Sequence, residues 1–464
     1  MRRRDGSWLL PPLLLLLAAC AAEPAPPAPP PPVEAAPPES GRPCFPGAQG
    51  WGTRTPGGRG GAVLLVTHLR DGGPGSLRAA VEAELPRVVV FRVAGTVTLE
   101  KKLEITAPFL TVAGETAPGG GICLRGAPVL VRTHDVVLRH LRVRLGPGSQ
   151  GDALRIGPAA ERVVVDHCSL SWGVDETVSV TGANDVTLSW CLIAEGLREA
   201  GHEKGQHSMG LLMRQSRRVA IHHCLFARSR DRNPQLEEGS AALVLGNVVS
   251  HWKNATRLND MDDPWPGLAD VVDNLYLNPR RPRGEVVLSS SVTHARVFLR
   301  GNRGPRRASD PQDEWALVTD ESPGGRFALD ARGPTLPPCG VESPGPGRAW
   351  EAIRACVGAL PRDACDARIV RDVEEGSGPD AIDDPAEVGG WPALDPGSPP
   401  PDRDGDGLPD AWEREHGLDP ADPRDVWSDP DGDGTGPLEA WLIERAAALA
   451  HDAAAGAAGG AGGG

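Results

Sequence analysis

A short pattern typical of a β-strand recurs along the middle of this chain. It appears as VVLRHLRVRL at 136–145, VVVDHCSLSW at 163–172, VTLSWCLIAE at 186–195 and VAIHHCLFAR at 219–228, with weaker copies LVLGNVVSHW at 243–252 and VVDNLYLNPR at 271–280. The copies follow one another at steps of 23 to 33 residues, a period that on short β-branched segments is typical of a solenoid. We therefore expect an all-β stack of short strands, which offers a long groove suited to a long polymer.

Aligning the copies places like side chains at like positions one coil apart. The aligned set comprises His140, His167, Trp190, His223, Asn247, Asn274 and Asn302. In-register strands stack such residues into ladders. We expect the three asparagines to hydrogen-bond along the stack through their amides, and the ladder as a whole to be scaffold.

The first 20 residues have the features of an export signal. Arg2–Arg4 precede an apolar run at Leu13–Leu17, which is too short for a permanent membrane span. Because the run leads through two alanines to Cys20, it resembles the bacterial lipoprotein signal, in which Cys20 would be lipidated; the alternative is an ordinary cleaved signal. We expect an exported protein that is lipid-anchored at the bacterial outer membrane or cell surface, or else secreted.

The nine cysteines are an odd number for an exported chain. Three of them share one position of successive copies: Cys168, Cys191 and Cys224. We expect a buried stack of thiols there, with a strained disulfide as the alternative. Cys339, Cys356 and Cys365 lie in a loop-rich region where one pair could be bridged.

Composition divides the rest of the chain. We expect a Pro/Ala-rich spacer at 21–43, a β-helix domain at 44–370, a linker at 371–399, a small separate unit at 400–446 and a disordered Ala/Gly tail at 447–464. The net charge of −14 is concentrated in the small unit, which holds 14 Asp/Glu against 4 Arg. The main domain is therefore near neutral and can accept an anionic ligand, especially with a bridging divalent cation. We expect a monomer with no nucleic-acid partner.

The small unit carries the most specific metal-binding motif. In DRDGDGLPDAWE the spacing is that of an EF-hand-type calcium loop, and its expected ligands are Asp402, Asp404, Asp406, the Leu408 carbonyl and Glu413, with a possible water through Asp410. A second copy has Asp429, Asp431 and Asp433, but its acid, Glu439, comes one residue early, so that site is weaker. The unit resembles type-3 or dockerin-like calcium repeats; the alternative is a solvated acidic linker.

The main domain has a second group of acids, on consecutive coils. Asp152, Asp175 and Glu176 form an oxygen-only set, which favours Ca²⁺ over Zn²⁺. For Asp166 we expect instead a buried acid that is hydrogen-bonded to backbone. The longest step between copies contains a polar insertion at 195–210, and loops on a rigid solenoid are where function concentrates.

Several motifs in order, from Phe45 to Trp252, carry a resemblance to a known family. They are FPGAQGWG, GGRGG, VTHLRDGGPGSLR, TVAGETAPGGGI, VDHCSLSWGVDE, VTLSWCLIAEGL and HHCLFARSRDRNP. This stretch resembles the family-1 polysaccharide lyases, the pectate lyases. The resemblance implies a single-stranded right-handed parallel β-helix that cleaves polygalacturonate by Ca²⁺-dependent β-elimination.

The resemblance also implies roles for individual residues. Arg232 takes the place of the catalytic arginine, and Lys204 would hold the substrate carboxylate with Arg230 and His207 nearby. The Ca²⁺ positions match the acidic set of the main domain.

Two positions depart from the family pattern. Glu237 stands where a second arginine is common, and Ser179 where a further carboxylate is expected. These departures keep two alternatives open: a non-catalytic, surface-tethered pectin-binding protein, and a glycoside hydrolase on the same fold, which would need paired acids across the groove.

Overall fold

The computed structural model describes residues 41–460 apart from 238, 260–266, 281–283, 294, 311, 430, 431 and 433. The predictions for Cys20, the signal and most of the spacer, and for Asp431 and Asp433, lie outside the described residues. None of the helices in the described part is long and apolar enough to cross a membrane.

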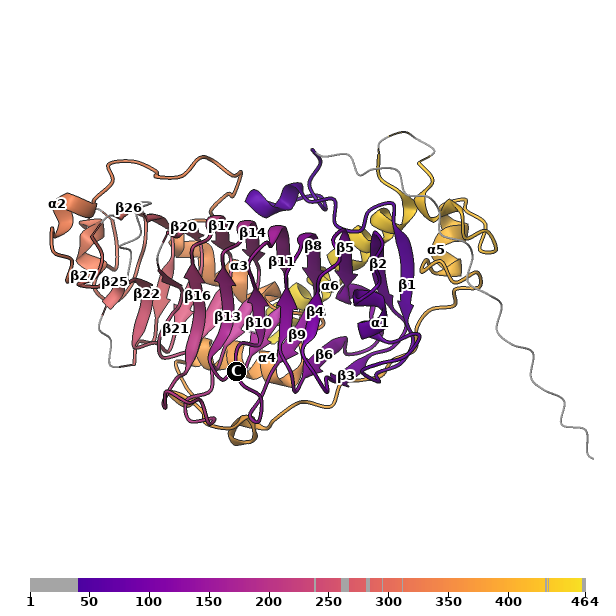
Figure 1. Cartoon of the computed structure of the whole chain (residues 1–464), viewed down its shortest axis with the longest axis horizontal. Helices are drawn as coiled ribbons and strands as arrows, with labels where there is room; N and C mark the ends of the chain where they lie inside the picture. The colour runs from indigo at the N-terminus through magenta and orange to yellow at the C-terminus, as the bar shows by residue number, and fades with distance from the viewer. Residues whose placement is uncertain are drawn as a thin grey trace, which may run out of the picture. The chain divides into compact units, whose positions relative to one another are not determined.

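Three parallel sheets wind around one core (Figure 1). The first sheet contains β1 (Ala62–Val66), β2 (Arg87–Phe91), β5 (Leu110–Ala113), β8 (His134–Arg139), β11 (Glu161–Asp166), β14 (Asn184–Ser189), β17 (Arg217–His222), β20 (Ala241–Leu245), β23 (Leu268–Val272) and β26 (Arg296–Arg300). The second contains β4 (Leu103–Ile105), β7 (Val129–Val131), β10 (Leu154–Ile156), β13 (Glu176–Thr181), β16 (Met209–Arg214), β19 (Gln235–Leu236), β22 (Asn254–Leu258), β25 (Gly284–Leu288) and β27 (Val318–Asp320). The third contains β3 (Gly95–Thr98), β6 (Ile122–Arg125), β9 (Leu141–Arg144), β12 (Ser169–Ser171), β15 (Leu192–Ala194), β18 (Leu225–Ala227), β21 (Val248–Ser250) and β24 (Leu275–Leu277).

Each strand pairs in parallel with the equivalent strand of the next coil. Val163 faces Val186, and Val186 faces Val219, which is the register of the sequence repeat. Alternate residues of the strands point inward, where valine, leucine and isoleucine fill a buried core. The parallel β-helix predicted from the repeat is thereby confirmed.

The predicted ladders form along this register. The Nδ2 of Asn247 donates to the Oδ1 of Asn274 at 3.0 Å, and that of Asn274 donates to Asn302 at 2.9 Å. The rings of His140, His167, Trp190 and His223 stack with successive centroid distances of 5.0, 5.8 and 4.6 Å. Both ladders lie within the repeated strands and turns, as the alignment predicts.

The cysteines of the described residues are free thiols. The three predicted to stack, Cys168, Cys191 and Cys224, are fully buried in the core. Neither a bridge among them nor one within Cys339, Cys356 and Cys365 is present. The buried stack is therefore confirmed, because its three thiols pack in the core as small apolar groups. Both disulfide alternatives are wrong.

One short helix, α1 (Leu77–Val81), lies between β1 and β2 in the sequence. The other helices follow the last coils: α2 (Arg326–Leu329), α3 (Pro346–Cys356), α4 (Ala364–Glu375), α5 (Asp410–Glu415) and α6 (Pro437–Gly460). A buried arginine on β9, Arg144, holds α4 through Asp363 at 2.6 Å and Asp366 at 2.7 Å. Farther along, Leu408 and Leu438 pack on Val88 and Val90 of β2. The calcium-motif segment thus lies against the first coils of the β-helix.

Candidate active site and cation clusters

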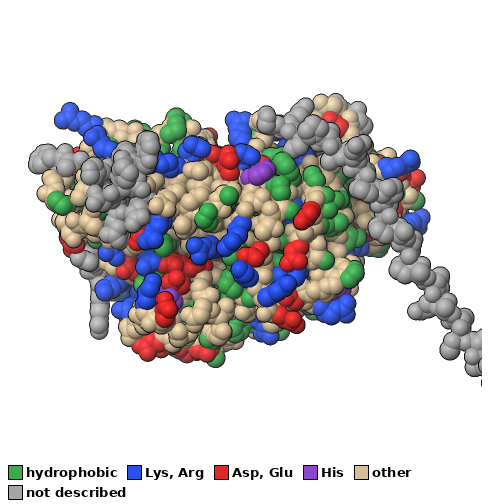
Figure 2. Space-filling view, viewed as in Figure 1, with side chains coloured by type: hydrophobic (Ala, Val, Ile, Leu, Met, Phe, Trp, Pro, Cys, Tyr) green, Lys and Arg blue, Asp and Glu red, His purple; other side chains and the backbone are tan. Residues whose placement is uncertain are grey.

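The main-domain candidates meet where strands of the second sheet begin. Asp152 precedes β10, Glu176 is the first residue of β13, and Arg232 precedes β19. These strands are neighbours in the order β10–β13–β16–β19, so one register brings residues far apart in sequence to one edge. Figure 2 shows acidic and basic side chains intermingled over this part of the molecule.

Three carboxylates form the centre of the site. One oxygen from each of Asp152, Asp175 and Glu176 lies within 4.8 Å of the others. Asp152 is buried and accepts hydrogen bonds from the Glu176 N–H at 3.1 Å and from the Ser179 hydroxyl. Desolvation raises the pKa of its carboxyl to about 6, and the nearby charge of Asp175 adds to the shift. The predicted acidic set is therefore assembled in space.

Arg232 reaches this cluster from the next coil but one. Its Nη1 contacts Glu176 Oε1, and burial lowers the pKa of its guanidinium despite the acids around it. Its backbone has a φ of +63°, which is unusual for a side-chain-bearing residue. Gly210 on β16 makes this arrangement possible, because a Cβ there would lie 2.5 Å from the Arg232 carbonyl oxygen.

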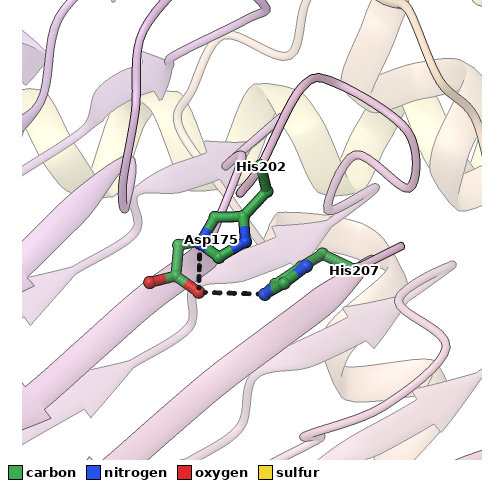
Figure 3. Close-up of side chains that lie close together, drawn as sticks. All are labelled: Asp175, His202 and His207. Carbon is green, nitrogen blue, oxygen red and sulfur yellow. Dashed lines mark ion pairs between the residues drawn. The ribbon is translucent and has the colours of Figure 1, made fainter. Parts of the chain in front are cut away.

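The inserted loop brings two imidazoles to Asp175 (Figure 3). His202 and His207 lie with their Nε2 atoms 3.5 and 3.3 Å from Asp175 Oδ1. Lys204 is exposed in the turn between them. Arg230 lies near the same loop, with its Nη1 3.4 Å from Gln206 Oε1. His202 was not among the sequence candidates; the only signal for it was its place in the insertion.

Both departures from the family pattern have local structural consequences. Glu237 is buried, and its charge is paired with Arg214 on β16 at 2.7 Å. Ser179 supplies no charge but donates its hydroxyl to Asp152. Glu237 thus has an arginine of the neighbouring coil, Arg214, as its partner. The Ser179 hydroxyl bonds to Asp152 at the position where a further carboxylate was expected.

A second acidic cluster lies in the C-terminal unit. Asp402, Asp404 and Asp406 come together as predicted, and Asp406 also groups with Glu413 and Asp425. Glu413 is fully buried and both of its carboxylate oxygens lack a hydrogen-bond partner. Burial, with neighbouring acids, raises the pKa of Asp406 to about 8 and that of Glu413 to about 7.

Asp410, the ninth position of the motif, was expected to contact the ion through a water, but in the structure it binds protein groups instead. Asp410 accepts the Arg403 N–H at 2.7 Å and pairs with Arg414 at 3.1 Å. Asp425, which the sequence motif does not include, comes to the cluster from the connection between the two copies. The weaker copy shows Asp429 accepting the Gly434 N–H at 3.0 Å.

A further cavity lies elsewhere, over the aromatic ladder. It has a volume of about 600 Å³ and is lined by Phe45, His140, Trp190 and Ile443 among others. Asp166, which directly precedes the ladder residue His167, also lines this cavity, and its carboxylate is bound by neighbouring side chains. It bonds to His167 at 2.9 Å, Ser189 at 2.7 Å and Arg139 at 3.4 Å. Its partners are side chains, so the predicted backbone bonding is wrong, although the prediction of a buried, satisfied acid is confirmed.

Comparisons with known proteins agree with this architecture. The chain is 33% identical over 393 residues to a probable pectate lyase C from Aspergillus terreus, spanning 81% of this chain and 88% of that one. A probable pectate lyase C from Emericella nidulans is 32% identical over 416 residues, spanning 86% and 91%. No protein-family model matches the chain. These relatives place it in the polysaccharide lyase class of enzymes.

Solved structures match the fold. A pectate lyase from Bacillus sp. N165, in complex with trigalacturonate, aligns with a TM-score of 0.50 at 13% identity over 68% of this chain and 99% of that chain. Another pectate lyase, described for its anti β-elimination mechanism, also aligns at 0.50, with 12% identity, over 68% and 97%. With the Aspergillus and Emericella relatives, the conclusion is direct: this chain belongs to the pectate lyase family.

Proposed function

We propose that this enzyme cleaves polygalacturonate by Ca²⁺-dependent β-elimination, giving oligogalacturonides with 4,5-unsaturated ends. The observation that supports this most strongly is the placement of Arg232, half-buried and with a lowered pKa, beside three clustered carboxylates. A glycoside hydrolase would instead use two carboxylates as acid and base and would have no need of Arg232.

The reaction begins with the proton on C5 of a galacturonate unit. This proton is acidic because it is alpha to the C6 carboxylate, and its loss places negative charge on that carboxylate. A neutral Nη of Arg232 is the group that accepts the proton. A free guanidinium has a pKa above about 12, so the burial that lowers this pKa is essential to the role.

Glu176 controls how readily Arg232 becomes neutral. The two side chains are in contact, and a carboxylate partner favours the charged guanidinium. A cation held by the acidic set would draw Glu176 toward Asp152 and Asp175 and away from Arg232. The guanidinium would then lose its nearest anion and its pKa would fall further, which would favour the neutral base.

The acidic set fits a calcium ion. Asp152, Asp175 and Glu176 offer the oxygen ligands that Ca²⁺ prefers. The pKa of Asp152 is raised because its carboxyl is poorly solvated and lies close to the charge of Asp175. Bound Ca²⁺ would bind the substrate carboxylate and stabilise the charge that develops on it. Lys204, exposed on the loop, and Arg230 are placed to bind further substrate carboxylates.

A product assay separates the candidate functions. Purified protein is incubated with polygalacturonate, and the ultraviolet absorbance of unsaturated ends is followed with and without EGTA. We expect absorbance that requires Ca²⁺. New reducing ends without this absorbance would indicate hydrolysis, and binding without any product would indicate a pectin-binding protein.

We further propose that the C-terminal cluster binds a structural Ca²⁺. Its ligands would be Asp402, Asp404, Asp406, Glu413 and Asp425, with the Leu408 carbonyl as in the motif. The unpaired buried oxygens of Glu413 support this, because a buried charge without a partner is strongly unfavourable. Ca²⁺ at 100 times its Kd should stabilise the fold by about 2.7 kcal/mol. Thermal unfolding of Glu413→Gln should lose this Ca²⁺ dependence, whereas Glu415→Gln, on the same helix, should keep it.

For the exported state we propose lipidation of Cys20 and anchoring to a bacterial membrane. The motif before Cys20 supports this. Labelling of cells with a palmitate analogue should mark the wild type and not Cys20→Ser; equal labelling of both proteins would contradict it.

A further inference from the structure

The inserted loop holds two imidazole nitrogens against one carboxylate oxygen. The Nε2 atoms of His202 and His207 are 3.5 and 3.3 Å from Asp175 Oδ1 (Figure 3). The ring centroids are only 3.7 Å apart, and each histidine side chain is 8% exposed. Two nitrogens and a carboxylate oxygen thus converge on one small volume between the two largely buried imidazoles and Asp175, whose side chain is 34% exposed.

The hydrogen bonds of His207 fix which nitrogen carries its proton. Its Nδ1 lies 2.9 Å from the Gly205 carbonyl oxygen, which can only accept, so Nδ1 is the donor. In the neutral ring the Nε2 lone pair then points at the Asp175 oxygen. Two lone pairs at 3.3 Å repel unless a cation lies between them. Histidines that bind metal commonly donate their second nitrogen to a carbonyl in this way.

We propose that Asp175, His202 and His207 bind a borderline first-row divalent cation, of which Zn²⁺ and Co²⁺ are the test cases. Two imidazoles and one carboxylate suit such ions and leave positions open for water. Ca²⁺ prefers oxygen ligands alone, so this site differs in chemistry from the acidic set next to it. Both sets use Asp175.

The two histidines should contribute unequally. The Nδ1 of His202 accepts the Lys204 N–H at 3.1 Å, so in the neutral ring its proton is on Nε2. To bind a metal through Nε2, His202 must move that proton to Nδ1 and give up the bond to Lys204. His207 needs no such change, because its Nε2 is already free of a proton.

Sharing of Asp175 predicts competition with Ca²⁺. A cation held by the histidines draws Asp175 away from Asp152 and Glu176. If the proposed lyase function holds, Zn²⁺ should therefore inhibit the enzyme, and added Ca²⁺ should relieve the inhibition. This consequence rests on the proposed function, whereas the metal site itself does not.

The test is a titration of chelator-treated, full-length mature protein with Co²⁺, followed by visible absorption, and with Zn²⁺ by calorimetry. Nitrogen ligation at low coordination number gives Co²⁺ bands much stronger than those of an all-oxygen site. We expect such bands in the wild type and at least a tenfold loss of affinity, about the lower bound for groups that support a metal, in His207→Ala and His207→Gln. His202→Ala should lose less, and His68→Ala, a histidine in a different loop bonded to the Pro74 carbonyl, should lose nothing.

Weak oxygen-type bands in the wild type, or bands unchanged in both His207 variants, would overturn the site; a proton would then be the cation between His207 and Asp175. Far-ultraviolet circular dichroism checks that each variant is folded. Because the readout is spectroscopic, a protein that binds Co²⁺ as expected but makes no unsaturated product would refute the lyase function and leave the metal site standing.

Discussion

Two acids on this β-helix, Asp166 and Asp152, have opposite surroundings. Asp166 lies in the ladder, where Arg139, His167 and Ser189 all bind its carboxylate. Asp152 has a hydroxyl and one backbone N–H as partners, with two further acids beside it. Both acids are buried and both sit on repeated coils, so position in the solenoid does not distinguish them.

Their pKa values do distinguish them. Burial alone would raise both, but the charge and hydrogen bond of His167, with Arg139, hold the pKa of Asp166 well below its usual range. Desolvation instead raises that of Asp152 to about 6. An acid whose charge the protein itself neutralises is scaffold, whereas an acid left with other acids awaits a cation from outside.

Removal of the base should have the largest effect. Arg232→Ala should lower kcat by about 10²- to 10⁴-fold, the usual contribution of a general base. Arg218→Ala removes an exposed arginine paired with Asp185 and should leave kcat unchanged. The rate of unsaturated-product formation measures both, and normal turnover of Arg232→Ala would refute the assignment of the base.

Moving the backbone of Arg232 should lower the rate of catalysis less than removing its side chain does. In Gly210→Ala the new Cβ must push back the Arg232 backbone, and small misplacements cost up to about 10²-fold in rate. Gly72→Ala is the matched control, because a Cβ there meets open space. Equal kcat/KM values for the two variants would show that the position of the Arg232 backbone does not matter.

The ladder should affect stability and its pH dependence rather than catalysis. Burial opposes protonation of His167, but the charge and hydrogen bond of Asp166 raise its pKa to about 9. A histidine with a raised pKa stabilises the fold below its unfolded value of about 6.5, and this stability is lost as pH rises through about 9. Denaturant unfolding of His167→Gln should show a flatter dependence between these values; an unchanged slope would contradict the pairing.

We expect the smallest effects in how the free energy of unfolding depends on pH below about 6, where Asp152 and Asp166 should contribute slopes of opposite sign. Because the pKa of Asp152 is raised to about 6, the metal-free fold binds extra protons and should lose stability as pH rises from about 4 to 6. Asp166, with its lowered pKa, should gain stability as pH rises toward and past the unfolded value of about 4. Unfolding in EGTA should show Asp152→Asn removing the falling segment and Asp166→Asn the rising one. Slopes of the same sign would contradict the comparison.

The repeat predicted the coil, the ladders and the grouping of the acidic set, because register in a β-helix follows directly from sequence spacing. It could not predict contacts made by segments outside the register. The approach of His202 to Asp175 depends on how the 195–210 insertion folds back. Asp425 reaches the C-terminal cluster through a connection that the calcium motif does not describe.

The helices that pack beside the coil could not be predicted either, because their contacts also lie outside the register of the repeat. The segment after residue 306 shows no regular pattern, yet it forms α3 and α4 along the coil. Its attachment depends on buried pairs such as Arg144 with Asp363 and Asp366. Charges separated by more than 200 residues carry no local signal of their pairing.

The most direct test of the central claim compares Asp152→Asn with Asp166→Asn in the lyase assay, at limiting and saturating Ca²⁺. Asp152→Asn should fold normally, need more Ca²⁺ and lose most of its kcat/KM. Asp166→Asn should be less stable by about 3 kcal/mol, as for a broken buried ion pair, yet keep wild-type kcat/KM per folded molecule. Equal activity losses in both variants, or a loss confined to Asp166→Asn, would contradict the division between scaffold and site.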